Sequence, residues 1–196
     1  MTATKRLPEN YVHFRTLDLT KNKAVMILLN LAGLILFFLF GWFFLWLAML
    51  MRSGQAPLQF NFPLLPWLLA LLATYAGVLI LHELVHGLFF WLITRERPYF
   101  GLKQLYAYAA APDWYIPRNP YLLVGLAPLI LITFLGIILI PFVSQFGLIL
   151  LLFAMTANAA GAIGDIFVVG WLVNLPSGIL VRDDGDTFAV YKVESP

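Results

Sequence analysis

Two histidines and one glutamate lie close together inside an otherwise apolar stretch of the chain. His82, Glu83 and His86 are the only acidic or basic residues between about residues 64 and 93. Because positions i and i+4 share one face of a helix, the two imidazoles can bind the same metal ion. Glu83 falls beside them, where its carboxylate can reach a water on that metal. The spacing therefore predicts a zinc site, with His82 and His86 as ligands and Glu83 as the general base.

A catalytic zinc usually has three protein ligands and one water, so a third ligand is expected elsewhere. Asp165 is the only other acidic residue within the apolar stretches. Glu83 lies roughly 15 Å, and Asp165 roughly 14 Å, from the same polar end of its predicted helix, so the two sites can be level. We therefore expect Asp165 to be the third ligand, with Asp113 as its rival. The alternative for Asp165 is a hydrogen bond to a neighbouring helix.

Asn158 precedes Asp165 by seven residues and therefore lies on nearly the same helix face. Its amide could donate a hydrogen bond to a metal ligand, to bound substrate or to a developing oxyanion. The alternative is a hydrogen bond that only joins two helices.

The composition restricts the classes of protein to consider. Of 196 residues, 62% are hydrophobic and only 11% are charged, which is more apolar surface than a soluble domain of this size can bury. The absence of cysteine excludes disulfides and thiolate metal ligands. A net charge of +2, with no basic block, gives no indication of nucleic-acid binding. The chain is therefore expected to be an integral membrane protein with the lipid bilayer as its solvent.

The apolar stretches are long enough to cross ~30 Å of hydrocarbon. They predict four transmembrane helices, and we expect an all-α membrane fold with a polar N-terminal tail (1–23), one membrane domain (24–174) and a C-terminal tail (175–196). The predicted spans are residues 24–51, 64–94, 121–143 and 146–174.

Two of the remaining segments have β-like sequence. Residues 95–120 are rich in aromatic side chains and are expected to form an interfacial or re-entrant element, the alternative being an ordinary surface loop. In the C-terminal tail, Asp184-Gly185 separates two apolar runs, which predicts a small β-hairpin. Either segment could hold a substrate by strand addition.

The basic residues predict the orientation. With four spans, all twelve Lys and Arg residues except Arg52 fall on the side of the two tails and of residues 95–120. Cytoplasmic segments carry the excess of Lys and Arg, so both termini are expected in the cytoplasm and the protein in the cell membrane.

Taken together, His82-Glu83-x-x-His86 in one span and an Asn and an Asp two spans later resemble the site-2 protease group of intramembrane zinc metalloproteases. The chain resembles more closely the small four-span bacterial and archaeal membrane proteins of the zincin peptidase family. The resemblance covers about residues 64–174. In site-2 proteases the later helix carries a proline-rich Asn-to-Leu-Asp-Gly pattern. Here Asn158 and Asp165 are one residue closer, with glycines and no prolines between them.

The expected function is zinc-dependent hydrolysis of peptide bonds within or next to the membrane, in a membrane or membrane-adjacent protein substrate. Two other classes stay open. One is a non-proteolytic protein with a structural or vestigial zinc site that acts through protein interactions. The other is a metal transporter, although the spans contain only one His/Asp cluster.

Overall fold

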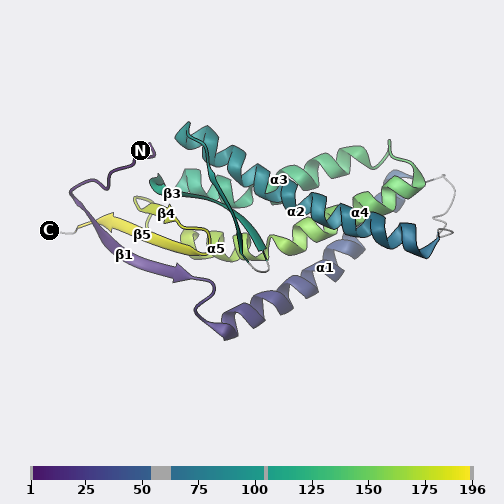
Figure 1. Cartoon of the computed structure of the whole chain (residues 1–196), viewed down its shortest axis with the longest axis horizontal. Helices are drawn as coiled ribbons and strands as arrows, with labels where there is room; N and C mark the ends of the chain where they lie inside the picture. Colours follow the sequence, from purple (N-terminus) through teal and green to yellow (C-terminus); the bar gives the residue numbers. More distant parts are fainter. Residues whose placement is uncertain (1, 54–62, 104–105, 195–196) are drawn as a thin grey trace. The chain divides into compact units, whose positions relative to one another are not determined.

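A computed structural model describes residues 2–53, 63–103 and 106–194 of the chain (Figure 1). Within these residues, four helical segments are long and apolar enough to cross a membrane, and they agree with the predicted spans to within a few residues. Many large apolar side chains on these segments are exposed; Trp42 and Leu64, for example, are each 73% exposed. The four segments are α1 (Lys23–Met51), α2 (Leu64–Thr94), α3 (Arg118–Leu139) and the segment Gln145–Val173.

The fourth segment is two helices and not one. Helix α4 (Gln145–Gly161) is followed by its C-cap residue, Ala162, and α5 (Ile163–Val173) begins directly after it. Gly161 and Gly164 flank the break, and glycine destabilises a helix by ~1 kcal/mol relative to alanine. As a result Asp165 lies in the first turn of a new helix.

The segments outside the spans form a five-stranded antiparallel sheet, so the expected all-α class is wrong in this respect: the protein is mostly helical with a small sheet (Figure 1). Residues 95–120 contribute two strands and the N-terminal tail contributes one. The predicted C-terminal hairpin is confirmed. In sheet order the strands are β1 (Tyr11–Asp18), β5 (Thr187–Val193), β4 (Leu180–Asp183), β3 (Tyr106–Pro117) and β2 (Tyr99–Lys103).

The turn between β4 and β5 requires a glycine at position 185 and is held by hydrogen bonds of the two aspartates before it. Gly185 has φ +100°, a conformation that residues with a side chain rarely adopt. The backbone N–H of Gly185 donates to Oδ1 of Asp183 at 2.7 Å, and Asp184 N–H donates to the carbonyl of Thr187 at 3.0 Å. These bonds fix the register in which Asp183 opposes Phe188.

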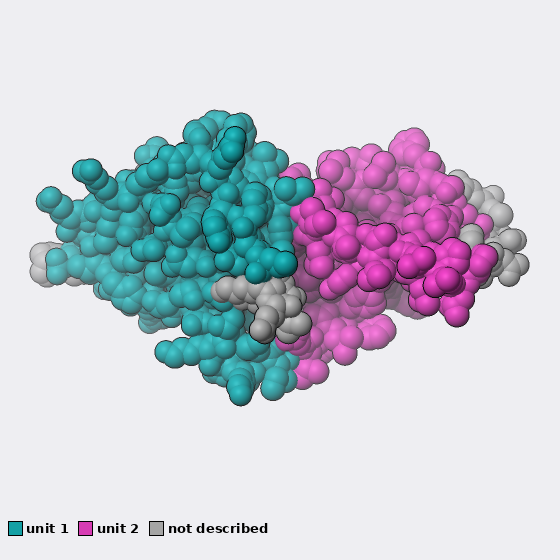
Figure 2. Space-filling view, in the orientation of Figure 1, with its two compact units in different colours: residues 1–29, 83–127, 164–196 teal, residues 30–82, 128–163 magenta. Residues whose placement is uncertain are grey.

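The chain divides into two compact units, each with its own core (Figure 2). The sheet unit comprises residues 1–29, 83–127 and 164–196, and its core packs the sheet against parts of α2, α3 and α5. The helical unit comprises residues 30–82 and 128–163 and has two smaller clusters. The fully buried side chains of the sheet-unit core include Ile116, Leu172, Ile179, Val181 and Val190. Those of the helical unit include Phe44, Ile140, Met155 and Ala159.

Candidate metal centre

One helix carries three of the predicted site residues. His82, Glu83 and His86 lie on α2, which continues without interruption from Leu64 to Thr94. The two histidines are therefore one turn apart and on one face, as the spacing predicts. Both are nearly buried, with 9% and 8% of their surface exposed.

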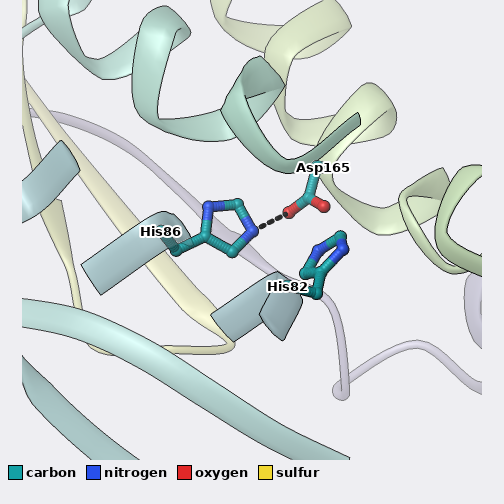
Figure 3. Close-up of side chains that lie close together, drawn as sticks. All are labelled: His82, His86 and Asp165. Carbon is teal, nitrogen blue, oxygen red and sulfur yellow. Dashed lines mark ion pairs between the residues drawn. The ribbon is translucent and has the colours of Figure 1, made fainter. Parts of the chain in front are cut away.

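Asp165 joins these histidines (Figure 3). One ligand atom from each of His82, His86 and Asp165 lies within 4.8 Å of the other two. Oδ1 of Asp165 is 3.4 Å from Nε2 of His86, and the Asp165 side chain is 26% exposed. The predicted rival Asp113 is exposed on β3 and does not belong to this group.

The donor set fits zinc. Two imidazole nitrogens and one carboxylate oxygen are ligands that zinc takes in catalytic sites. The ligand atoms of His82, His86 and Asp165 lie within 4.8 Å of one another, so one ion could be held by all three. A metal would also compensate the cost of a carboxylate within an apolar helix.

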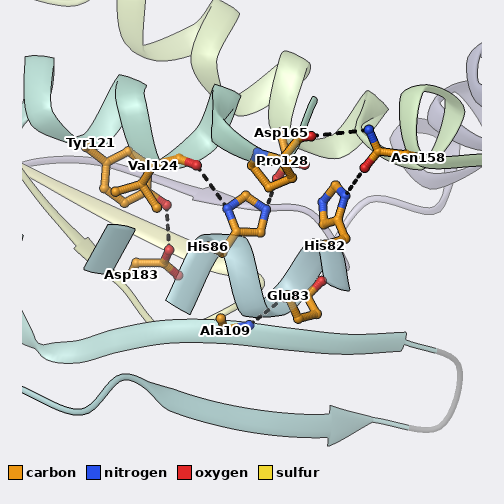
Figure 4. Close-up of polar contacts among 10 residues, drawn as sticks. All are labelled: His82, Glu83, His86, Ala109, Tyr121, Val124, Pro128, Asn158, Asp165 and Asp183. Carbon is orange, nitrogen blue, oxygen red and sulfur yellow. Dashed lines mark hydrogen bonds and ion pairs between the residues drawn. The ribbon is translucent and has the colours of Figure 1, made fainter. Parts of the chain in front are cut away.

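A backbone carbonyl orients His86. Its Nδ1 lies 3.0 Å from the carbonyl oxygen of Val124 on α3 (Figure 4). Since a carbonyl only accepts hydrogen bonds, Nδ1 must carry the proton. The lone pair of the neutral ring is then on Nε2, the nitrogen that lies toward Asp165.

Asn158 orients His82 in the same way. Its Oδ1 lies 3.0 Å from Nδ1 of His82, and its Nδ2 donates to the carbonyl of Pro128 at 3.2 Å. Asn158 is 2% exposed, so these contacts take place away from water. Asn158 therefore contacts the candidate ligand His82 through its oxygen, as an acceptor, whereas the sequence predicts a donated bond; the bond that it donates goes to Pro128.

Glu83 is held by the sheet. Its Oε2 accepts a 2.7 Å hydrogen bond from the backbone N–H of Ala109 on β3 (Figure 4). This bond fixes one carboxylate oxygen of the residue next to His82. The segment expected to be an interfacial or re-entrant element, residues 95–120, therefore supplies through Ala109 a direct contact to Glu83.

A buried pair that the sequence does not predict, Tyr121 and Asp183, also lies in the sheet unit. The hydroxyl of Tyr121 on α3 donates to Oδ2 of Asp183 on β4, and both residues are 4% exposed. Burial raises the pKa of Asp183 to about 6, although its hydrogen bonds from Tyr121 and Gly185 act in the opposite direction. In the sequence Asp183 looks like one more polar residue of a turn, and only its position directly after an apolar strand could have distinguished it.

Comparison with family models matches residues 75–180, more than half of the chain, to the family described as "Putative zincin peptidase". No curated protein and no solved structure matches the chain. The matched range contains His82, Glu83, His86, Asn158 and Asp165.

Proposed function

Because the chain belongs to the "Putative zincin peptidase" family, we propose that it is a zinc-dependent endopeptidase that hydrolyses peptide bonds within or next to a membrane. The observation that carries the proposal is the group of His82, His86 and Asp165, with Glu83 adjacent in the same helix. A structural zinc site has no need of a general base, so the presence of Glu83 favours hydrolysis.

His82, His86 and Asp165 would hold the ion. Bound Zn²⁺ supplies Lewis acidity, which lowers the pKa of a water molecule and polarises a scissile carbonyl. Glu83 would take a proton from the attacking water as the new C–O bond forms. It would then give that proton to the nitrogen of the peptide bond as the C–N bond breaks.

The sheet would keep Glu83 in place for these transfers. The Ala109 N–H fixes Oε2, so the carboxylate does not have to be ordered at the moment of reaction. A positioned general base contributes typically 10²–10⁴-fold to a rate. The same sheet ends in β2, an edge strand whose outer side could pair with an extended segment of substrate.

The four apolar helices support a location in a membrane. We propose that this is the cell membrane and that the substrate is a protein in or beside the bilayer. The placement of Lys and Arg favours both termini in the cytoplasm, so we propose that water reaches the site from that side.

The proposal is tested by proteolysis in liposomes. Purified protein, loaded with zinc, is reconstituted with a mixture of membrane-protein fragments, and new peptide termini are identified by mass spectrometry. We expect new termini with the wild type and none with Glu83→Gln, which retains the shape of the side chain but not its basicity. Equal cleavage by both proteins would refute the mechanism. Zinc flux across the same liposomes, without cleavage, would indicate a transporter.

A further inference from the structure

Pro128 lies inside α3, where every other residue type would donate a backbone hydrogen bond to the carbonyl four residues earlier. Proline has no N–H, so the carbonyl of Val124 lacks its usual donor within the helix. Val124 is 1% exposed, so water does not readily replace that donor. The donor is instead Nδ1 of His86, at 3.0 Å.

The carbonyl of Pro128 itself has a second role. It accepts from Nδ2 of Asn158, and a carbonyl cannot donate, so the Asn158 amide must turn its nitrogen toward Pro128. Its oxygen then faces Nδ1 of His82 at 3.0 Å. The amide oxygen only accepts, so His82, like His86, must carry its proton on Nδ1.

We infer that Pro128 is a positioning residue for both histidines: its missing N–H directs the Val124 carbonyl to His86, and its own carbonyl directs Asn158 to His82 (Figure 4). The inference rests on the proposed function and adds to it a residue that touches neither metal nor substrate. One turn of α3 thereby sets which nitrogen of each ring can bind zinc. A proline that only kinks the helix would have no such effect.

Three substitutions separate these roles. Pro128→Ala restores the N–H that competes for the Val124 carbonyl, while the carbonyl of residue 128 remains. Asn158→Ala removes the contact to His82 and leaves that of His86. Pro120→Ala is the matched control, because Pro120 lies in the first turn of α3, where an N–H has no partner within the helix.

Two measurements apply to each protein in detergent. The first is the imidazole Nδ1–H signal of each histidine in ¹⁵N-histidine-labelled, metal-free protein, and its protection from exchange with solvent. This proton is present in both the neutral Nδ1–H form and the imidazolium, so the readout does not depend on the state of Nε2. His13, the third histidine, is outside the site and serves as an exposed reference. The second measurement is the dissociation constant of Zn²⁺ alone, by chelator competition.

We expect Pro128→Ala to lose protection of the His86 Nδ1–H and to keep that of His82, and Asn158→Ala to show the reverse. Both should bind zinc 10–100-fold more weakly, roughly the effect of removing a partner of a ligating histidine. The metal-free melting temperature of Pro128→Ala should equal or exceed that of the wild type, because alanine favours a helix interior. Pro120→Ala should leave both signals and the zinc affinity unchanged.

The inference is overturned if Pro128→Ala keeps the His86 signal and wild-type zinc affinity. It is also overturned if weaker zinc binding comes only with a lower melting temperature, which would indicate a general packing role. A wild type that binds no zinc would overturn the proposed function, whereas the Nδ1–H signals, recorded without metal, would still decide the role of Pro128.

Discussion

The buried carboxyl of Asp183 should make the stability of the protein depend on pH. The side chain is enclosed in the sheet unit, 4% exposed, and accepts hydrogen bonds from the Tyr121 hydroxyl and the Gly185 N–H. Burial disfavours the charged form and raises the pKa of Asp183 from 3.8 to about 6. In the unfolded chain the same carboxyl titrates near its ordinary value.

Whether stability rises or falls with pH depends on whether the folded or the unfolded protein binds the Asp183 proton more tightly. Between about pH 4 and about pH 6 the folded protein retains a proton that the unfolded chain has lost, so stability falls as the pH rises through this window. A pKa difference of about two units, at 1.36 kcal/mol per unit, corresponds to about 3 kcal/mol in the free energy of unfolding. Above about pH 6 both states are ionised, and this contribution no longer changes.

Asp183→Asn removes the titrating group and isolates its effect. The variant should be less stable by a constant amount of ~1–3 kcal/mol, because one amide oxygen cannot replace both acceptor oxygens. In addition to this constant amount, the difference in free energy of unfolding between wild type and variant should change by about 3 kcal/mol between about pH 4 and about pH 7. As the pH rises, the free energy of unfolding of Asp183→Asn therefore increases relative to that of the wild type.

The assay is denaturant unfolding in detergent at several pH values, with a chelator present so that metal binding does not contribute. Asp184→Asn is the matched control, since the Asp184 side chain is 39% exposed and its pair with Arg182 is on the surface. It should keep most of the wild-type pH dependence, because burial is the largest cause of the raised pKa of Asp183 and the nearby charge of Asp184 is a smaller one. A difference between wild type and Asp183→Asn that is the same at every pH would refute the assignment of a raised pKa to Asp183.

Three further outcomes are expected. Glu83→Gln should retain zinc and lose at least 10²-fold of any peptidase rate in a quenched-peptide assay, because Gln cannot accept the proton. Gly125→Ala should lower stability to denaturant by ~1–3 kcal/mol, because the new Cβ would lie 2.8 Å from Cγ2 of Val169, one turn along α5 from Asp165. The matched control Gly77→Ala should not, since among the described residues its Cβ would meet no atom within 4 Å. Chelation of zinc should lower the melting temperature, by an amount equivalent to ~2.7 kcal/mol when zinc was at one hundred times its dissociation constant.

The sequence was sufficient for those features that one helix or one local pattern determines. The shared face of His82 and His86 follows from helical periodicity, and the hairpin at Asp184-Gly185 follows from turn chemistry. Asp165 is the only other acidic residue in an apolar span, so the sequence predicts it as the third ligand, and the structure groups it with the two histidines.

Beyond the C-terminal hairpin, the pairing of the sheet could not be predicted, because β1 and β3 pair with strands far away in the chain. Tyr11 on β1 opposes Val193 on β5, and Ala111 on β3 opposes Asp183 on β4. Pairing at such distances leaves no periodic signal in the sequence, and short strands in polar tails resemble loops. The contact between Ala109 and Glu83 depends on that sheet and was hidden for the same reason.

The carbonyl that accepts a hydrogen bond from His86 could not be predicted from the sequence either. A proline inside an apolar helix indicates that one carbonyl lacks its intrahelical donor. Which side chain then supplies the hydrogen depends on the packing of α2 against α3 within the sheet unit, where His86 meets Val124.

The zinc content per chain of detergent-purified protein decides whether His82, His86 and Asp165 bind one zinc ion. We predict about one zinc in the wild type and in Glu83→Gln, and loss of zinc in His86→Ala and Asp165→Ala. Asp113→Ala should retain the metal, because Asp113 is exposed on β3. Zinc retained in Asp165→Ala, or a wild type that binds none even after reconstitution with the ion, would contradict this account.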